Sequence, residues 1–530
     1  MRVNMLYRDR EELRTNGYLD KDDIVKDFNL EVILKKLEQE RKKTEEEKPK
    51  MADKDTYLET TFQKVIMVPL ETAEEVYYRQ GFMRDAMKQP ELFEECYRIA
   101  KEAVADIDKR KDDVKARKAA SSGGYQGAAV MSALVFLKQM GSRLDELREV
   151  VIKYESNLVS DEMKGFVRDF LEEYNEQFIE DYRKIMEDMD GILNGRTLIL
   201  GSTLGSGLKQ TNLYLKEIGK KENALGQISK LKSFFSPNSR KLSGEEALDD
   251  AERLRDAAVS YVLHYFDDFL ADKEEFFKRL RFQAAFYTCG AWLCRSLQGY
   301  GVTMCMPEVV ERKDLYFENL TELSLCLHTK SVPTGNDLDS MDKWLLVVTG
   351  ANQGGKSTYL RSVGIAQMFL QAGLFVTAAQ FKSGLYHNIF THFTRREDSA
   401  MNSGRLVEEL QRMDTIMQNI TEDSILFLNE SFATTTEKEG SVIAWDISKA
   451  LYESGVRVLT VTHLLEYAKK CYEEKLEHAI FLSAERKKNG ERTYRIKVSE
   501  PEMTSYGLDL YENMIGKVDR ELLESEVSAG

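Results

Sequence analysis

Residues 344–358 of the chain are WLLVVTGANQGGKST, and the stretch YLRSVGIAQMFLQ follows at 359–371. The apolar run predicts a buried strand, the glycines predict a tight loop, and the second stretch predicts a helix. Glycine has no Cβ, so its backbone can wrap a phosphate closely, and the N-terminus of the helix adds partial positive charge. This segment therefore predicts a strand, a phosphate-binding loop and a helix, in that order.

The loop supplies candidate ligands for a nucleotide. Lys356 is expected to hold the β- and γ-phosphates, and Ser357 is expected to bind Mg²⁺. A glycine-rich turn without a ligand is the alternative, which the flanking strand and helix disfavour. The expected nucleotide-binding residues of the loop are Gly350, Ala351, Asn352, Gln353, Gly354, Gly355, Lys356, Ser357 and Thr358.

Short apolar runs separated by helical patterns continue downstream of the loop. The runs at 425–428 and 456–461 predict strands that alternate with helices, which is typical of a mainly parallel sheet covered by helices. Residues 479–483 and 493–498 flank a turn at 488–490, so they predict an antiparallel hairpin.

Two of these strands end in candidate catalytic groups. The run at 425–428 leads into Glu430, and a carboxylate at a strand end in the same sheet as the phosphate loop lies near the attacking water. Glu430 is therefore the candidate general base. His463 follows the run at 456–461 and could contact the γ-phosphate or polarise the water. The alternatives are a solvated acid and a structural histidine.

Upstream, apolar residues at 57–300 recur three and four apart among charged residues, which predicts helices packed on helices and suits an arm or lever. Breaks at 121–124 and 201–244 predict loops or hinges.

The stretch 209–241 carries a local charge of +6, from eight Lys or Arg against Glu217 and Glu222. Such cations can hold DNA phosphates without reading sequence, although a charged stretch can also be plain solvated surface. The candidate DNA contacts are Lys209, Lys216, Lys220, Lys221, Lys230, Lys232, Arg240 and Lys241.

Composition restricts the possible functions. The net charge of -15 excludes a general nucleic-acid coat, so any contact with DNA must be local. The six cysteines form no C-x-x-C pair, which indicates reduced structural thiols. The start, MRVNMLYRDREELR, is charged, and no apolar run reaches the roughly 18 residues of a membrane span. We expect a cytoplasmic protein with no membrane partner.

Several motifs together resemble the ATPase domain of the MutS DNA mismatch-repair family, and the resemblance covers residues 330–515. Two upstream segments are also similar: VPTGNDL at 332–338 matches the family segment beside the adenine, and YRQGFMRDAMKQPEL at 78–92 matches the start of its helical core. The ATPase motifs, in the family's order, are TGANQGGKSTYLR (349–361), FVTAAQ (375–380), NSGR (402–405), LFLNES (426–431), LTVTH (459–463) and TSYGLDL (504–510).

The resemblance implies an α + α/β chain, in which a long-helix core or lever domain precedes an ABC-type P-loop ATPase domain with a mainly parallel sheet. It implies ATP and Mg²⁺ as cofactors, with Glu430 activating water and His463 sensing the γ-phosphate. Ser403 matches the serine that reaches a partner's nucleotide, so a homodimer, or a heterodimer with a MutS-like paralogue, is expected through the ATPase domains. The expected segments are a lead-in (1–56), a helical core or lever (57–325) with a clamp-like part (201–244), the ATPase domain (326–516) and a tail (517–530).

Departures from the family pattern affect the metal site and the upstream domains. Asn429 stands where the family has a metal-side aspartate, so Mg²⁺ should be held less firmly and hydrolysis should be slow or partner-dependent. The roughly 300 residues before the ATPase leave no room for mismatch-recognition and connector domains. We therefore expect no mismatch reading by this chain and, without a nuclease domain, no strand cleavage.

These observations favour a dimeric, ATP-driven clamp or sensor of duplex or branched DNA. A nucleotide-gated interaction scaffold that does not bind DNA is the alternative, which the acidic balance and Asn429 both permit. A small-molecule kinase is a third hypothesis, disfavoured by the dimer-type motifs around Ser403 and at 505–507.

Overall fold

A computed structural model describes residues 3–8, 17–46, 56–120, 126–193, 198–204, 210–218, 245–395, 404–487 and 492–501. The chain divides into two compact units. The helical unit comprises residues 1–3 and 91–285, and the sheet unit comprises residues 4–90 and 286–530. This division places residues 57–90 and 286–325 with the sheets. The domain boundaries expected from the sequence remain predictions.

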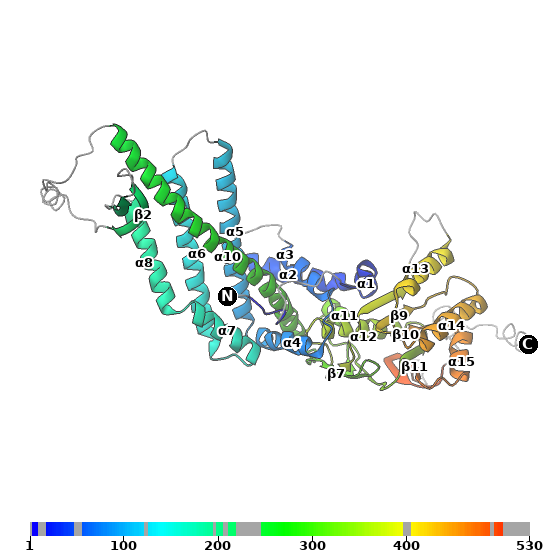
Figure 1. The fold of residues 1–530 in the computed structure, drawn as a ribbon. Helices are drawn as coiled ribbons and strands as arrows, with labels where there is room; N and C mark the ends of the chain where they lie inside the picture. The colour runs from blue at the N-terminus through cyan, green and yellow to red at the C-terminus, as the bar shows by residue number, and fades with distance from the viewer. Residues whose placement is uncertain are drawn as a thin grey trace, which may run out of the picture. The chain divides into compact units, whose positions relative to one another are not determined.

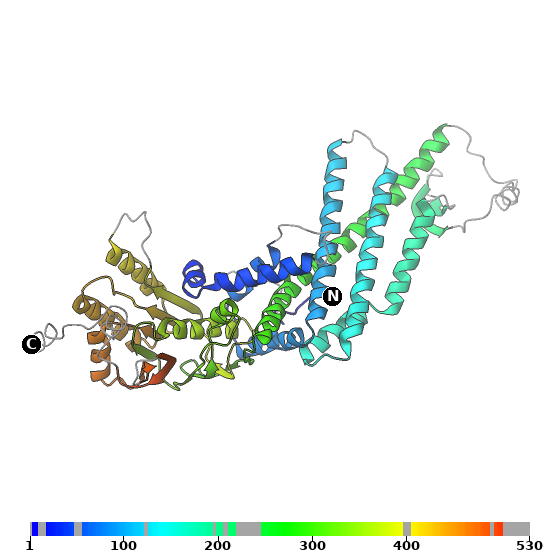
Figure 2. The same cartoon turned by 180° about the vertical axis from the view of Figure 1, so that it is seen from behind.

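Long helices build the helical unit, and Figures 1 and 2 show α5, α6 and α8 running roughly side by side. No helix among the residues described is long and apolar enough to cross a membrane. The elements are α5 (Pro90–Ala120), α6 (Gln126–Glu155), α7 (Asp161–Glu173), α8 (Glu176–Leu193), β1 (Leu198–Leu204), β2 (Gln210–Ile218) and the first part of α10 (Glu245–Gly299).

Apolar side chains one helical turn apart hold these helices together. Leu137, Met140 and Leu144 of α6 are fully buried, as the helical periodicity predicts. At the surface between α5 and α6, Arg143 pairs with Glu102 at 2.5 Å. The predicted stack of helices is therefore confirmed.

The expected loop at 201–244 is wrong in part, because β1 and β2 form an antiparallel hairpin that extends to Ile218. The stretch QTNLYLKEI contains the β-branched residues Thr211 and Ile218 and the aromatic residue Tyr214, which are types that favour a strand. Of the candidate DNA contacts, Lys216 lies on β2. The other seven lie outside the described residues, as does the break at 121–124.

Within the described part of the sheet unit, six strands form the main sheet in the order β12-β11-β6-β10-β9-β8. The first five strands from β8 to β11 are parallel, and β12 pairs with β11 in the antiparallel sense. The mostly parallel sheet and the strands of the hairpin are confirmed, while the turn at 488–490 lies outside the described residues. The strands are β6 (Leu345–Gly350), β8 (Asn388–Phe393), β9 (Ser424–Asn429), β10 (Arg457–Val461), β11 (Ala479–Arg486) and β12 (Arg492–Val498).

Helices cover this sheet and bury its apolar strands. Val347, Leu426 and Val458 are completely buried, which explains why β6, β9 and β10 are nearly continuous apolar runs. The covering helices are α12 (Lys356–Gln371), α13 (Arg405–Asn419), α14 (Glu437–Glu453) and α15 (Leu465–Glu473).

A second, smaller sheet stands beside the first and was not predicted. Its strand order is β3-β7-β4-β5, and Phe317 on β4 stacks on Phe381 of β7. Its elements are β3 (Glu308–Val309), β4 (Leu315–Leu320), α11 (Leu323–Thr329), β5 (Asn336–Asp339) and β7 (Gln380–Ser383).

Helices from the start of the chain also belong to the sheet unit. The ring of Phe28, just after α1, packs edge-on against Phe393 and Phe427 and is fully buried. On α12, Gly364 lets this ring approach, since an added Cβ would lie 2.2 Å from it. These helices are α1 (Lys21–Asp27), α2 (Leu30–Glu46), α3 (Tyr57–Ile66) and α4 (Ala73–Lys88).

The cysteines agree with the expectation of reduced structural thiols. All six are free, and burial raises the pKa of Cys96 and Cys471 to about 12. Thiols held so far from ionisation are poor nucleophiles at neutral pH.

Candidate nucleotide-binding site

The phosphate loop joins β6 to α12 and depends on glycine at two close approaches. Gly350 has φ of 106°, and an added Cβ there would lie 2.9 Å from the backbone nitrogen of Ala484 on β11. At Gly354 an added Cβ would lie 2.8 Å from the Cβ of Ala484. The neighbouring strand therefore leaves room for the loop only where side chains are missing.

Lys356 is the first residue of α12, and its side chain folds back into the loop. Its ammonium donates to the carbonyl oxygens of Gly350 at 2.8 Å and Ala351 at 3.0 Å. The residue is 5% exposed. A buried ammonium beside a helix N-terminus is a suitable partner for an anion such as a phosphate.

The two residues that are expected to bind Mg²⁺, Ser357 and Asn429, are in contact with each other. The Ser357 hydroxyl donates to the side-chain oxygen of Asn429 at 2.8 Å, which joins the start of α12 to the end of β9. Both are oxygen donors, the type that Mg²⁺ prefers, but both are neutral. Within the described ranges, no group of three acidic, histidine or cysteine side chains could hold a metal. The arrangement fits Mg²⁺ that arrives with phosphate oxygens.

Glu430 and His463 meet at the ends of β9 and β10. Nε2 of His463 lies 2.9 Å from Oε1 of Glu430, and the backbone nitrogen of Glu430 donates to Val461 at 2.8 Å. The hydrogen bond from His463, with smaller help from its charge and that of Lys356, holds the pKa of Glu430 below its usual range. Glu430 is thus ionised at neutral pH, as a general base must be.

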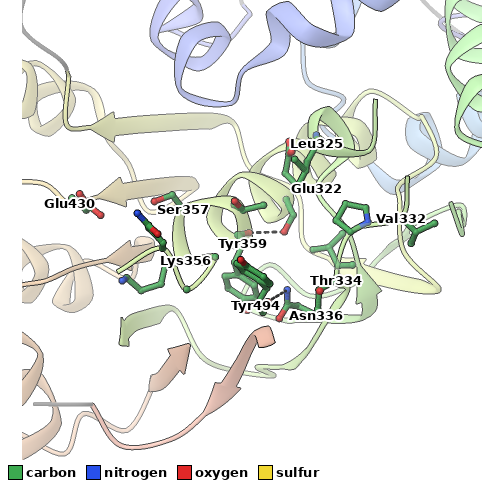
Figure 3. A pocket seen from close by; sticks show the side chains of 17 residues that line it. Glu322, Leu325, Val332, Thr334, Asn336, Lys356, Ser357, Tyr359, Glu430 and Tyr494 are labelled. Carbon is green, nitrogen blue, oxygen red and sulfur yellow. Dashed lines mark hydrogen bonds between the residues drawn. The ribbon is translucent and has the colours of Figure 1, made fainter. Parts of the chain in front are cut away.

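These groups line or border a cavity of about 530 Å³. Figure 3 shows Lys356, Ser357 and Glu430 at one end and Val332 at the other. The volume is within the usual range for small-molecule sites, about 300 to 1,000 Å³. The lining residues are Leu320, Glu322, Leu325, Val332, Pro333, Thr334, Asn336, Gln353, Gly354, Gly355, Lys356, Ser357, Thr358, Tyr359, Ser362, Glu430 and Tyr494.

Not every predicted residue reaches the cavity. Gly350, Ala351 and Asn352 belong to the loop but are absent from the cavity wall. Asn429 and His463 border the cavity through Ser357 and Glu430. Ser403 lies outside the described residues, so its predicted role stays a prediction.

The end of the cavity away from the loop contains residues that motif reasoning missed. Tyr494 on β12 lies over Gly355, and it has a left-handed backbone with φ of 60°. Its carbonyl accepts from Asn336 at 3.5 Å, and the oxygen of Asn336 accepts from the Ile496 nitrogen at 2.7 Å. Asn336 belongs to the segment 332–338, which was expected to lie beside adenine. For Tyr494, the only signal in the sequence was its place in the predicted hairpin.

Comparison with known proteins gives matches on both units. The family model for MutS domain V matches residues 346–519, and the model for the MutS2 N-terminal domain matches residues 71–300. The DNA mismatch repair protein MutS of Protochlamydia amoebophila is 32% identical over 160 residues, which cover 30% of this chain and 18% of that protein.

Two further relatives carry the same name. MutS of Chlorobium phaeobacteroides is 33% identical over 185 residues, covering 34% of this chain and 21% of the relative. MutS of Thermotoga sp. (strain RQ2) is 32% identical over 170 residues, covering 32% and 21%. The matched part spans about a fifth of the length of these relatives. The MutS2 N-terminal model covers all of residues 91–285 of the helical unit, and the MutS domain V model contains the loop and the strand ends just described. The chain therefore belongs to the MutS family.

Proposed function

We propose that this chain is an ATP-dependent DNA-binding protein of the MutS type, a dimeric clamp or sensor of DNA structure driven by ATP binding and hydrolysis. The observation that carries the proposal is the contact between His463 and Glu430 beside the phosphate loop. A loop alone binds a nucleotide, but an ionised carboxylate at the phosphate end of the cavity also provides a base for hydrolysis.

Each residue has a separate role in the proposed ATPase. Lys356 and the N-terminus of α12 offset the charge of the β- and γ-phosphates. Glu430 accepts a proton from the attacking water, and His463 keeps that carboxylate ionised and oriented. Tyr494 and the segment 332–338 offer an aromatic and polar wall to the adenine ring of the nucleotide. Bound MgATP supplies the phosphoryl group that is transferred to water.

Asn429 sets the expected rate. It holds the Ser357 hydroxyl without contributing a negative charge, so Ser357 and Asn429 together would hold Mg²⁺ less firmly than a site with a carboxylate there. Slow hydrolysis by the isolated chain, or hydrolysis that depends on a partner, follows from this arrangement.

The proposed dimer forms through the ATPase domains, as a homodimer or with a MutS-like paralogue. Val407 and Leu410 on α13 are 48% and 38% exposed, and they offer apolar surface directly after the segment that carries Ser403. We retain Ser403 as the residue that reaches the nucleotide of the partner. We also retain the core or lever domain at 57–325 and the ATPase domain at 326–516.

The proposed DNA contacts are to the backbone of duplex or branched DNA, through the cations at 209–241 that include Lys216 on β2. Since the net charge of the chain is -15, this local +6 stretch must supply the attraction. Binding should therefore weaken steeply as salt rises.

The test measures ATP hydrolysis by the purified chain with no DNA, homoduplex, mismatched duplex and four-way junction, with Glu430→Ala as the inactive control. Stimulation by junctions but not by a mismatch supports a sensor of DNA structure. ATP binding with no DNA response at any salt concentration would favour the nucleotide-gated scaffold, which the acidic net charge permits. Transfer of phosphate to an acceptor other than water would indicate a kinase.

A further inference from the structure

The helix α1 lies outside both matched ranges, 71–300 and 346–519, yet it packs against β8 at the edge of the main sheet. Two acidic residues of this helix, Asp23 and Asp27, are each 8% exposed, whereas Asp22 faces solvent, and Asp23 is the one that forms ion pairs with arginines. A carboxylate is rarely buried without partners. Its partners therefore show what the helix is attached to.

Asp23 pairs with two arginines that come from different elements. Its Oδ2 lies 3.1 Å from Nη2 and accepts from Nε of Arg412, on α13, at 3.3 Å. Its Oδ1 pairs with Arg395, two residues beyond β8. Arg412 also donates to the carbonyl oxygen of Phe393, the last residue of β8, at 3.1 Å. One carboxylate thus ties α1 to both α13 and the end of β8.

The end of β8 in turn holds the backbone of the candidate base. Thr394, next to Arg395, donates from its hydroxyl to the carbonyl oxygen of Glu430 at 2.6 Å, and from its backbone nitrogen to Asn429 at 3.1 Å. Glu430 has φ of 54°, a left-handed conformation that residues with a Cβ adopt only when their surroundings hold it. The position of Glu430 therefore depends on Thr394.

A second set of contacts leads from α13 to the same loop. Oε2 of Glu409 accepts from the backbone nitrogen of Phe432 at 3.1 Å and from the Thr434 hydroxyl at 3.0 Å. Phe432 also has left-handed backbone, with φ of 64°. His392 of β8 lies 2.7 Å from the Ser431 hydroxyl and 3.1 Å from the Glu409 carbonyl oxygen. Both elements that Asp23 holds thus brace the loop after β9.

We propose that Asp23 is a positioning residue for the ATPase site. It fixes β8 and α13 relative to each other through Arg395 and Arg412, and these elements fix the strained loop that carries Glu430. Asp23 does not line the cavity, so it acts on the orientation of the base and leaves ATP binding alone. This inference rests on the proposed ATPase function.

The experiment compares Asp23→Asn with Asp22→Asn in the full chain, measuring kcat, the dissociation constant for MgATP and the thermal unfolding midpoint. The first variant removes the buried charge and the second removes an exposed charge from the same helix. We expect Asp23→Asn to lower kcat between about 10-fold and 100-fold, because a small misplacement of a catalytic group costs that much. MgATP affinity should change less than about twofold, since no cavity contact is lost.

A double variant, Asp23→Asn with Arg412→Gln, shows whether the two residues act together. If they do, the double variant loses no more kcat than the more damaging single variant, because residues that act as a unit are not additive. Additive losses, a normal kcat in Asp23→Asn, or an equal loss in Asp22→Asn would each overturn the inference. If Asp23→Asn does not fold, Arg395→Gln replaces it, since Arg395 is 37% exposed in its side chain, and a normal kcat there also overturns the inference.

The wild-type chain separates this inference from the proposed function. A wild type no faster than Glu430→Ala, with every DNA and without DNA, removes the proposed ATPase itself. An active wild type with an equally active Asp23→Asn variant removes only the role of Asp23.

Discussion

Replacing Asn429 by Asp should tighten Mg²⁺ binding, so that hydrolysis proceeds at lower Mg²⁺ concentrations. The side-chain oxygen of Asn429 already accepts from the Ser357 hydroxyl at 2.8 Å, so the new carboxylate would take the same position and add one negative charge. Groups that support a metal ligand typically change metal affinity by about 10- to 100-fold, or roughly 1.4 to 2.7 kcal/mol. Because this hydrogen bond is only partly buried, solvent screens the charge, and we expect about tenfold.

The assay titrates Mg²⁺ at fixed ATP and records the concentration that gives half-maximal hydrolysis. Asn429→Asp should lower this concentration, while Asn429→Ala, which removes the acceptor for Ser357 without adding charge, should raise it. An unchanged or higher half-maximal Mg²⁺ concentration in Asn429→Asp would refute the reasoning, because it would show that the site does not sense charge at this position.

Three further variants test other parts of the sheet unit. His463→Ala removes the hydrogen bond that lowers the pKa of Glu430, so the acidic limb of the pH–kcat profile, where the base is lost by protonation, should move to higher pH. Tyr494→Ala should weaken ATP binding about tenfold in equilibrium titrations, near the lower end of aromatic–base stacking energies because Tyr494 is 51% exposed. Arg41→Ala leaves the buried carboxylate of Glu59 without its partner at 2.8 Å, which should cost about 3 to 5 kcal/mol in urea unfolding.

The main features of the candidate nucleotide site could be predicted because short sequence patterns encode them. Glycine spacing marks the loop before Lys356, and an apolar run ending in a polar group marks the strand end at Glu430. Each pattern depends on residues within one strand–loop unit. The parallel sheet then brings the strand ends together at one edge, as the contact between Glu430 and His463 confirms.

Features that depend on contacts between distant segments could not be predicted. The second sheet pairs β4 with β7, whose residues are more than 60 positions apart, and its short strands have no strong periodicity. Tyr494, whose backbone is left-handed, reaches the cavity because the pairing of β12 with β11 places this residue beside Gly355. Asp23 is one of three acids in KDDIVKD, and only the packing of α1 distinguishes it from Asp22.

Three of the contacts that hold the end of β9 and the loop after it should have separate effects in experiments. The side chain of Asn429 faces Ser357, the carboxylate of Glu430 faces His463, and the backbone of Glu430 is held by Thr394. A change at Asn429 should therefore appear in the Mg²⁺ requirement, and a change at His463 in the pH profile. A change at Asp23, which acts through the backbone, should lower kcat without moving either. If variants at all three positions altered the same quantity, the loop would behave as one cooperative unit, and separate roles could not be assigned to these residues.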